Sequence, residues 1–320
     1  MNVLRDLADV PERPAGRAVT IGAFDGVHLG HQAVLRLVRD LANVRGLTAT
    51  MLTFDKHPAE VVRPDSAPCL LTSLEQKLEL IAATDTVEEC VVLTFDEARS
   101  KETAEEFVSE VLAGVLRTRL VIVGADFHFG YRRHGDVPLL QRMGAELGFE
   151  VLGLGLVASP DGRAAPDSAL PYSSTRVRTL LSAGDVAGAA VTLGRPHEVR
   201  GPVEHGDARG RELGFPTANV AVPARVCLPT DGVYAGTFTG TDGVERAAAI
   251  SLGRRPTFYA DAGLRLLEAY VLDFDGDLYD QPARVRFHRH LRRQERFDSV
   301  DALIAQMGRD VAETRRLVPG

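Results

Sequence analysis

The chain contains very little lysine. Its 320 residues include only Lys56, Lys77 and Lys101, and none of these follows a glycine. The phosphate-binding loop GxxxxGK[ST] requires a glycine directly before its lysine, so the chain cannot contain that loop. A phosphate group would therefore have to be bound by arginine, histidine, backbone amides, a helix N-terminus or a metal ion.

Paired cysteines and long apolar runs are also lacking. The three cysteines are far apart and form no CxxC pair, which excludes the zinc sites built from such pairs. No segment approaches the length needed to span a bilayer, and the first residues carry charges where a signal peptide needs an apolar run. We therefore expect a cytoplasmic protein without a membrane partner.

The chain has no excess of positive charge. Its formal net charge is -7, and 25% of its residues are charged. A general nucleic-acid-binding protein needs a basic face or stripe, so we expect no nucleic-acid partner. With 45% hydrophobic residues the composition is that of an ordinary globular protein, and the length suits two domains. The sequence leaves homo-oligomer formation open.

The first part of the chain alternates short β-branched runs with amphipathic segments, which predicts βα units and a parallel sheet. Thr72 with Glu75, and Thr103 with Glu106, fit the capping-box pattern of a helix start. We expect strands at residues 18–23, 49–54, 90–95, 120–123 and 150–154, and helices at residues 32–44, 74–83, 104–116 and 138–147.

After Arg200 the pattern changes to short strands separated by turns, with no helices between them. This predicts an antiparallel barrel or sandwich, closed by a helix near the C-terminus. We therefore divide the chain into domains of residues 1–194 and 195–320, with a Pro- and Gly-rich loop at residues 158–171. The strands are expected at residues 233–238, 247–252, 264–272 and 283–288, and the helix at residues 299–317.

The segment 22–31 follows the first expected strand and opens the first helix, where open α/β sheets bind their ligands. Gly22, Gly26 and Gly30 recur every four residues, so the backbone can approach a triphosphate closely. His28 and His31 share one face of the first helical turn and can donate hydrogen bonds to phosphate oxygens. A lone histidine more often caps a helix, but the glycines and the preceding strand favour a phosphate site here.

Thr217 and Asn219 form the centre of a second motif. Their side chains lie on one side of an extended segment and offer hard oxygen ligands suited to Mg²⁺, which takes further ligands from ATP phosphates. The preceding loop, residues 205–211, could fold over a triphosphate. Glu268 could accept the proton of an attacking alcohol, although a lone glutamate is more often a solvated strand residue. Three aspartates at positions 273, 275 and 277 are interpreted as a charged hairpin turn and not as a Ca²⁺ loop.

The string TIGAFDGVHLGHQ resembles the flavin-adenylylating branch of the HxGH nucleotidyltransferase superfamily, as do TFDKHP, VGADFHFG and SSTRVR. The resemblance implies a Rossmann-like domain that joins FMN to AMP. Lys56 departs from this family, which usually has a proline between the aspartate and the histidine. The implied catalytic residues are His28, His31 and Arg178; the implied ATP-binding residues are Gly22, Phe24, Asp25, Gly26, Gly30, Ser174 and Thr175; the implied flavin-binding residues are Phe54, Pro58, Asp126 and Phe129.

The strings GRELGFPTANV, DGVYAG, RRPTF, LEAYVLDFDGDLYD and FDSVDALIAQMGRDV resemble the riboflavin kinase module. That resemblance implies a six-stranded antiparallel β-barrel with a C-terminal helix. The pair Arg254 and Arg255 departs from the family, which often has small polar residues there, and Asp280 stands where the family usually has a glycine. The implied roles are metal and nucleotide binding by Thr217 and Asn219, general base by Glu268, ATP binding by Gly206, Arg211 and Gly214, and flavin contact by Tyr234.

Together the two resemblances predict a bifunctional enzyme of FAD synthesis. The C-terminal site would phosphorylate riboflavin to FMN, and the N-terminal site would adenylylate FMN to FAD and release pyrophosphate, with ATP and Mg²⁺ at both sites. One alternative is a relative of class I aminoacyl-tRNA synthetases, since HLGH and SSTR are similar to its ATP motifs. Another alternative is a flavin-binding regulator without turnover.

Overall fold

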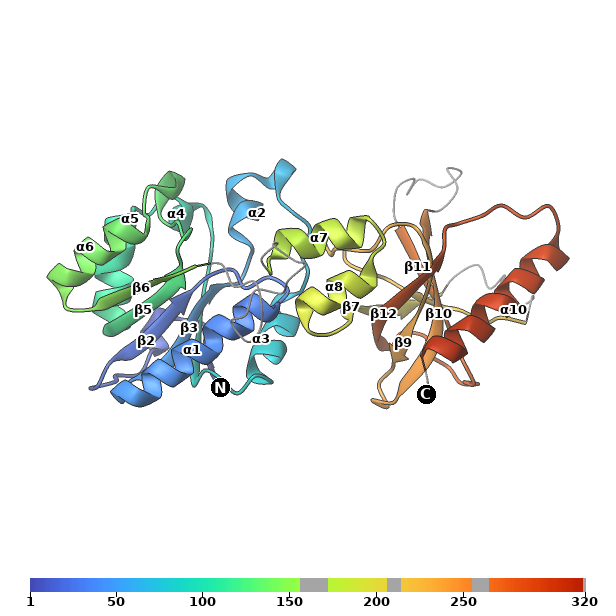
Figure 1. The fold of residues 1–320 in the computed structure, drawn as a ribbon, viewed down its shortest axis with the longest axis horizontal. Coiled ribbons are helices and arrows are strands. Elements are labelled where there is room, and N and C mark those ends of the chain that lie inside the picture. Colours follow the sequence, from blue (N-terminus) through green and yellow to red (C-terminus); the bar gives the residue numbers. More distant parts are fainter. Residues whose placement is uncertain (156–171, 206–213, 255–264, 319–320) are drawn as a thin grey trace. The chain divides into compact units, whose positions relative to one another are not determined.

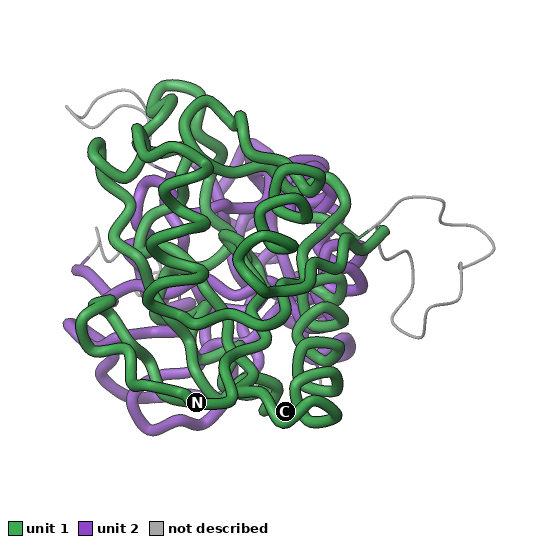
Figure 2. Tube along the Cα trace, turned by 90° about the vertical axis from the view of Figure 1, so that its left-hand side faces the viewer, with its two compact units in different colours: residues 1–173 green, residues 174–320 purple. Residues whose placement is uncertain are grey.

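A computed structural model describes residues 1–155, 172–205, 214–254 and 265–318. The chain divides into two compact units, Met1–Ser173 and Ser174–Gly320, shown as ribbons in Figure 1 and in two colours in Figure 2. The predicted loop at residues 158–171 and the predicted ATP-binding residues Gly206 and Arg211 lie outside the described residues. Among the helices in the described ranges, none is long and apolar enough to cross a membrane.

Unit 1 is built on a six-stranded sheet in which every neighbouring pair is parallel, as predicted. The strand order is β1-β4-β3-β2-β5-β6. The short strand β1 was not expected, because three residues are too few to show a period. The bounds are β1 Asn2–Leu4, β2 Arg17–Ile21, β3 Thr48–Phe54, β4 Glu89–Leu93, β5 Thr118–Gly124 and β6 Glu150–Leu154.

Helices cover both faces of this sheet (Figure 1). On one face, α1 (Leu29–Arg45) and α3 (Leu74–Ala82) pack on β2, β3, β4 and β5 through residues such as Leu35 and Ile81. On the other face, the π-helix η3 (Phe107–Val115) and α6 (Val137–Leu147) do the same through residues such as Leu112 and Leu140. Because the four inner strands β2, β3, β4 and β5 are largely buried on both faces, their sequences are mainly apolar and do not alternate.

Local helix signals were partly confirmed. The capping box Thr103–Glu106 opens α5 (Ala104–Glu106), which continues as η3 and not as the single α-helix expected at residues 104–116. The capping box predicted for Thr72 and Glu75 is wrong by one residue, because Ser73 and Gln76 cap α3. Shorter elements of this unit are η1 (Leu7–Asp9), α2 (Pro58–Val62), η2 (Pro64–Ser66), α4 (Glu97–Ser100) and η4 (Tyr131–Arg133).

Unit 2 is a closed antiparallel barrel with the strand order β10-β11-β8-β7-β12-β9. The helix α10 (Val300–Leu317) packs against β9, β10 and β12 as predicted, although Val300 at its start remains 57% exposed. The helices α7 (Ser174–Ser182) and α8 (Val186–Leu193) group with the barrel. The strand bounds are β7 His197–Glu204, β8 Ala218–Val220, β9 Gly232–Thr239, β10 Glu245–Arg254, β11 Arg265–Val271 and β12 Pro282–Arg292.

The aspartate-rich segment 272–281 was wrongly interpreted as a hairpin turn. It joins β11 to β12, but β11 pairs with β10 and β8, whereas β12 pairs with β7 and β9. A hairpin turn would join two paired strands. Asp280 has φ 60°, a left-handed conformation that favours glycine, which explains the glycine usual in the riboflavin kinase family at this position.

Candidate active sites

The predicted residues of the first site lie at one edge of the parallel sheet. Residues 22–31 follow β2, Phe54 ends β3, and Asp126 follows β5, and these strands are neighbours in the order β3-β2-β5. From β2 the chain continues to β3 and β4 on one side, and later to β5 and β6 on the other. The connections therefore diverge between β2 and β5, and the carboxyl edge at such a point is where α/β sheets bind ligands.

The loop between β2 and α1 has an unusual backbone. Phe24, Gly26 and Val27 have φ values of 51°, 83° and 41°. For a β-branched residue such as Val27 this left-handed conformation is strained, and such strain is stored where the surrounding structure enforces a particular loop shape. Phe24 and Val27 are buried, so core packing holds the loop in place.

His28 both caps α1 and belongs to the histidine pair. Its Nδ1 accepts a hydrogen bond from the backbone N–H of His31 at 3.3 Å, so the proton of the neutral ring is on Nε2. The rings of His28 and His31 are stacked with centroids 3.6 Å apart. The helix-cap interpretation is therefore confirmed for His28, and phosphate binding by the two imidazoles stays a prediction.

His31 is held in the neutral form. Burial, followed by the nearby His28 and Lys77, lowers the pKa of His31 well below 6.5. The Phe24 ring lies against it, with centroids 4.9 Å apart. Its Nδ1 is buried, and no partner within hydrogen-bond distance is found in the described part of the chain. A buried imidazole nitrogen without a protein partner is a candidate ligand-binding atom.

Gly30 is closely surrounded by other parts of the protein, and the approach of a triphosphate to its backbone stays a prediction. A Cβ atom at this position would lie 3.1 Å from two atoms of the His28 ring and 3.2 Å from the backbone oxygen of Tyr172. A Cβ atom at Gly22 would lie 3.1 Å from the Phe24 ring. Any larger residue at these positions would displace the aromatic side chains of the loop.

Asp25 has a structural task that the sequence did not reveal. Its carboxylate accepts hydrogen bonds from the backbone N–H groups of Leu71 and Thr72, at 3.0 and 3.1 Å. The Thr72 hydroxyl accepts in turn from the backbone N–H of Gly26 at 3.1 Å. Asp25 thus fastens the histidine loop to the segment before α3, and its contact with ATP stays a prediction.

Lys77 is a site residue that the sequence reasoning missed. It is buried on α3, and its Nζ donates to the backbone oxygens of Ala23 and Phe54 and to the Thr53 hydroxyl, at 3.1, 2.9 and 2.9 Å. Burial lowers the pKa of Lys77 to about 8. The available signal was its place on the apolar face of α3, where a charged residue is unusual.

The residues predicted to contact flavin surround the ends of β3 and β5. Phe54 packs edge-on against Phe95 with centroids 5.2 Å apart, and Pro58 opens α2. Phe129 stacks on Phe127 with centroids 5.4 Å apart, and Asp126 is exposed. The structure therefore brings these side chains to the same edge of the sheet as the histidine pair.

Ser174, Thr175 and Arg178 lie in the first turns of α7, where Ser174 and Arg178 are partly buried. They belong to unit 2, whereas the histidine pair belongs to unit 1. Their predicted roles in ATP binding therefore remain predictions.

The second site lies on the outside of the barrel. Glu268 on β11 is directly opposite Asn219 on β8, and both side chains alternate with buried neighbours that face the interior. The Asn219 Oδ1 atom is buried, and within the described ranges no hydrogen-bond partner reaches it. Thr217 lies two residues earlier and is also partly exposed, so the predicted shared side for Thr217 and Asn219 agrees with the burial pattern.

Two further side chains flank this pair and were not predicted. Glu204 on β7 lies opposite Asn219 on the other side, and Ser251 on β10 lies opposite Glu268. The Ser251 hydroxyl accepts a hydrogen bond from Gln294 at 3.0 Å. Cross-strand pairing could not be read from sequence, because it requires the strand order of the barrel.

Gly214 and Tyr234, the other predicted site residues of this unit, differ in exposure to solvent. Gly214 is exposed with φ 83°, as expected for a glycine in a turn. Tyr234 is fully buried, its hydroxyl donates to the Thr230 backbone oxygen at 2.6 Å, and burial raises the pKa of Tyr234 to about 12. Tyr234 therefore belongs to the barrel core, and its contact with flavin stays a prediction.

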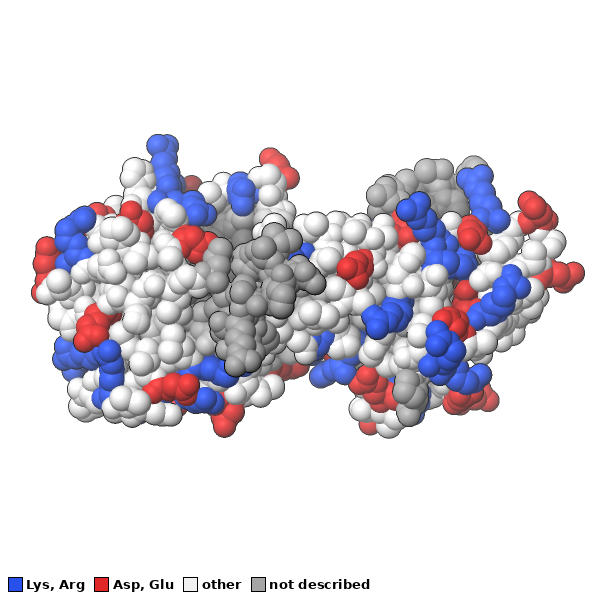
Figure 3. Space-filling model, viewed as in Figure 1, with Lys and Arg blue, Asp and Glu red and all other residues white. Residues whose placement is uncertain are grey.

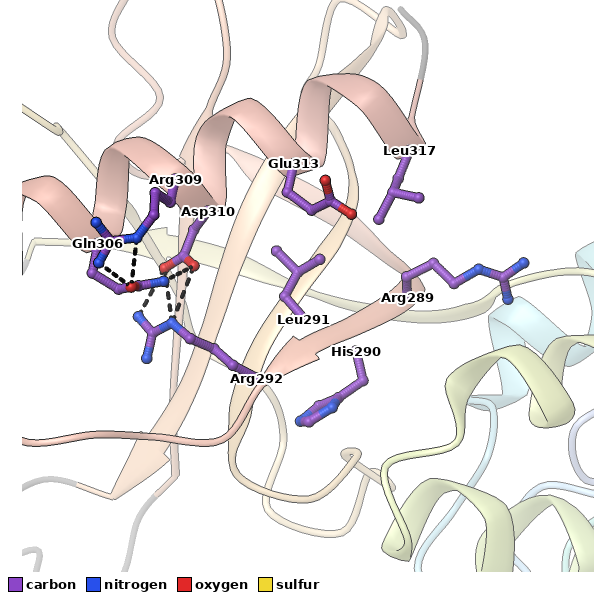
Figure 4. A pocket seen from close by; sticks show the side chains of 9 residues that line it. All are labelled: Arg289, His290, Leu291, Arg292, Gln306, Arg309, Asp310, Glu313 and Leu317. Atoms are coloured by element: carbon purple, nitrogen blue, oxygen red, sulfur yellow. Dashed lines mark hydrogen bonds and ion pairs between the residues drawn. The ribbon is translucent and has the colours of Figure 1, made fainter.

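A pocket of about 340 Å³ lies between β12 and α10 (Figure 4). Arg292 and Asp310 form an ion pair of 2.7 Å at one end of it. None of the predicted site residues lines this pocket. On the face shown in Figure 3, basic and acidic side chains are interspersed on both units.

The fold and the two polar clusters define a two-domain transferase, with a nucleotide-binding α/β unit followed by a β-barrel unit. Residues 10–163 match the FAD synthetase family, and residues 193–318 match the riboflavin kinase family. The chain belongs to the family of bifunctional riboflavin kinase/FMN adenylyltransferases of FAD biosynthesis, as predicted. The comparisons support neither the aminoacyl-tRNA synthetase alternative nor the regulator without turnover.

The similarity extends over the whole chain. The bifunctional riboflavin kinase/FMN adenylyltransferase of Escherichia coli strain K12 is 36% identical over 317 residues, covering 98% of this chain and 97% of that protein. The protein of the same name from Pseudomonas fluorescens is 38% identical, covering 99% and 98%. A crystal structure described as a macrolide-efflux protein from Streptococcus pneumoniae has a TM-score of 0.83 and 29% identity, covering 99% of both chains.

The family match and the compact units place the domain boundary at different residues. The riboflavin kinase match begins at residue 193, near the predicted boundary at residues 194 and 195. The compact units divide at Ser173, since α7 and α8 pack with the barrel. The functional boundary stays a prediction.

Proposed function

We propose that the chain makes FAD in two steps at two separate sites: the barrel phosphorylates riboflavin to FMN, and the parallel-sheet unit adenylylates FMN with release of pyrophosphate. The observation that supports this most is that each unit carries its own polar cluster. The kinase cluster is the Asn219–Glu268 pair, and the adenylyltransferase cluster is the His28–His31 pair. ATP is the second substrate of both reactions.

In the kinase step, Glu268 acts as the general base. The terminal hydroxyl of riboflavin loses its proton to the Glu268 carboxylate while its oxygen attacks the γ-phosphorus of ATP, and ADP leaves. Thr217 and Asn219 would hold Mg²⁺ in this step. The donor set fits such an ion, because the buried Asn219 Oδ1 is a hard oxygen acceptor for which the described residues supply no donor. When bound, Mg²⁺ neutralises charge on the ATP phosphates.

In the adenylylation step, the FMN phosphate attacks the α-phosphorus of ATP, and the bond to pyrophosphate breaks. No proton has to be abstracted from an ionised phosphate, so the protein acts mainly by binding and charge stabilisation. His28 donates from Nε2, whose proton is fixed by the helix-cap hydrogen bond at Nδ1. The neutral His31 lies beside it, and the N-terminal end of the α1 dipole adds a positive potential.

The remaining predicted residues complete the two sites in this proposal. Gly22, Gly26 and Gly30 give the phosphates access to the backbone, and Phe54, Pro58, Asp126 and Phe129 surround the flavin. Ser174, Thr175 and Arg178 contribute to ATP binding in the adenylylation step. We place the protein in the cytoplasm, without a nucleic-acid or membrane partner. The oligomeric state in solution can be measured by analytical ultracentrifugation.

A product analysis tests this proposal. Purified protein is given riboflavin, ATP and MgCl₂, and the flavins are separated over time. We expect FMN and then FAD, together with pyrophosphate, and we expect EDTA to stop both steps. Failure to form either FMN or FAD would reject the proposal. A lag in FAD formation would show that FMN is released between the sites.

A further inference from the structure

All three protons of the Lys77 ammonium group can be donated to oxygen acceptors within unit 1. A lysine ammonium has three protons, and Lys77 Nζ has three oxygen acceptors, at 2.9 to 3.1 Å, on Ala23, Thr53 and Phe54. The acceptors belong to two segments of the chain, one at Ala23 and the other at Thr53 and Phe54. Ala23 and Thr53 are 30 residues apart in sequence. Lys77 therefore joins two separate parts of the chain at one atom.

These two segments lead to the two halves of the first site. Ala23 directly precedes the loop that carries His28 and His31, on the ATP side. Phe54 ends β3 and leads into α2, on the side proposed for flavin. The Thr53 hydroxyl also donates to the Ala23 backbone oxygen at 3.4 Å, which strengthens the same junction.

The segment around α3 holds the histidine loop at a second point. Leu71 and Thr72, just before the helix, bind the Asp25 carboxylate, and Lys77 within the helix binds Ala23. The histidine loop is therefore fixed at two points, at Asp25 by the segment before α3 and at Ala23 by Lys77 within α3. Its buried φ-positive residues, Phe24 and Val27, lie next to these anchor points.

Burying an ammonium group is costly, and lysine is seldom fully buried. Lys77 is only 7% exposed. An apolar side chain on α3 could fill this space without a desolvation cost, but it could not join the two segments. The position at the ligand edge of the sheet, between two proposed substrate-binding segments, indicates a role in the reaction.

We propose that Lys77 is a positioning residue of the adenylyl-transfer site, which fixes the histidine loop relative to the end of β3 and thereby couples ATP binding to FMN binding. This inference rests on the function proposed above for unit 1. Lys77 does not touch the reacting atoms in this role. Its loss would change the distance between the two substrates, and small misplacements of reacting groups cost large factors in rate.

The protonation of Lys77 gives the proposal a pH signature. The groups that act on its charge are Asp25 in the loop, Asp55 after β3, Cys90 on β4 and His31 on α1. Burial lowers the pKa of Lys77 to about 8, whereas burial raises the pKa of the Cys90 thiol to about 12. The ammonium is therefore present below pH 8 and is lost above it, while Cys90 stays protonated. FAD formation from FMN should fall above about pH 8.

The test compares Lys77→Met and Lys77→Arg with Lys101→Met, a control at an exposed lysine of the same unit. For each protein, kcat and the KM values for ATP and FMN are measured from pH 6.5 to about 9.5. We expect Lys77→Met to lower kcat by about tenfold to a hundredfold, to raise both KM values and to lose the fall above pH 8. Lys77→Arg should recover part of the rate and shift that fall to higher pH. Lys101→Met should behave as the wild type.

Riboflavin phosphorylation by the same molecules belongs to unit 2 and controls for the amount of active protein, whereas the circular dichroism spectrum reports whether unit 1 is folded. Wild-type kcat and KM values in Lys77→Met would overturn the inference, as would a slow variant that keeps the wild-type alkaline fall. If Lys77→Met does not fold, Thr53→Val is measured in its place. This substitution removes one of the three hydrogen-bond acceptors of Lys77 with little change in side-chain volume. Unchanged KM values for both substrates in Thr53→Val would then overturn the inference. A wild-type protein that makes no FAD would instead reject the proposed function itself.

Discussion

Glu268 on β11 lies directly opposite Asn219 on β8, with both side chains on the outer face of the barrel. Residues paired in this way have Cβ atoms about 4.5–5.5 Å apart. A carboxylate and a buried amide oxygen are thereby held together although they are 49 positions apart in the chain (268 − 219 = 49). Rigid strand pairing keeps this geometry without help from a loop.

The first prediction concerns the base in the kinase step. Glu268→Gln keeps the shape of the side chain but removes the proton acceptor, so the kcat for FMN formation should fall by about 10²–10⁴. Conversion of added FMN to FAD should remain close to the wild-type rate, since it belongs to the other unit. Both rates are measured on the same preparation by separating the flavins.

Glu204→Gln is the matched comparison for Glu268→Gln, because Glu204 is the carboxylate on the other side of Asn219. Glu204 is exposed, whereas Glu268 is partly buried, so we expect Glu204→Gln to retain most of the kinase rate. If Glu204→Gln lowers the kinase rate as much as Glu268→Gln or more, then Glu268 is not the general base. Loss of both activities in Glu268→Gln would contradict separate sites.

The second prediction concerns the histidine pair. His31→Ala should lower FAD formation from FMN by about 10²–10³, the usual effect of removing one donor that stabilises transition-state charge. His28→Ala combined with His31→Ala should lower it further and leave FMN formation intact. His134→Ala, at an exposed histidine of the same unit, is the control.

The same pair predicts a pH dependence. Because the pKa of His31 lies well below 6.5, the ring is already neutral at pH 6.5, and His31 should contribute no change in the adenylylation rate as the pH is varied through 6.5. A rate profile of FMN conversion between about pH 5.5 and 7.5 checks this. A midpoint near 6.5 that disappears in His31→Ala would show that the ring is protonated more easily than the structure indicates.

The third prediction concerns the space around Gly30. A methyl group there would approach the His28 ring to 3.1 Å, and the Tyr172 backbone oxygen at 3.2 Å blocks the other direction. Gly30→Ala should therefore displace the His28 ring by a few tenths of an ångström and lower FAD formation about tenfold, with kinase activity unchanged. Gly308→Ala, at a helical glycine with no atom within 4 Å of the added methyl, is the control. A fully active Gly30→Ala protein would mean that the His28 position is not critical.

The fourth prediction concerns stability in acid. His197 is 2% exposed, it is hydrogen-bonded to the Cys227 backbone oxygen at 2.7 Å, and burial lowers the pKa of His197 to about 4. The unfolded chain takes up a proton at this residue below about pH 6.5, whereas the folded chain does not until about pH 4. The free energy of unfolding should therefore fall as the pH drops from 6.5 to 4, by up to about 3 kcal/mol from this residue.

Urea unfolding between about pH 7.5 and 4.5 measures this effect in the wild type and in His197→Gln, which keeps a hydrogen-bond donor. The expected result is a smaller dependence of the unfolding free energy on pH in the variant, whatever its absolute stability. An identical pH dependence in the two proteins would show that His197 is not buried as a neutral ring.

Sequence reasoning succeeded where the signal was local. Apolar runs predicted the five expected strands of the parallel sheet to within two residues at each end, since the inner strands are buried on both faces. The capping box at Thr103 and the glycine-lined segment before α1 were also visible, because each depends on residues within one helical turn. The capping box at Thr72 failed because two adjacent residues fit the pattern, and only packing selected Ser73.

The sequence by itself determined the two-part architecture, the family and the residue types that carry the chemistry. Only the tertiary structure decided which of those residues meet. The Asn219–Glu268 pairing depends on the closed strand order of the barrel, and the junction at Lys77 depends on α3 packing against β3 and β4 beside the chain that follows β2. Both arise from contacts between segments far apart in the chain, whose free energy comes from burial and cross-strand pairing and leaves no periodic trace in the sequence.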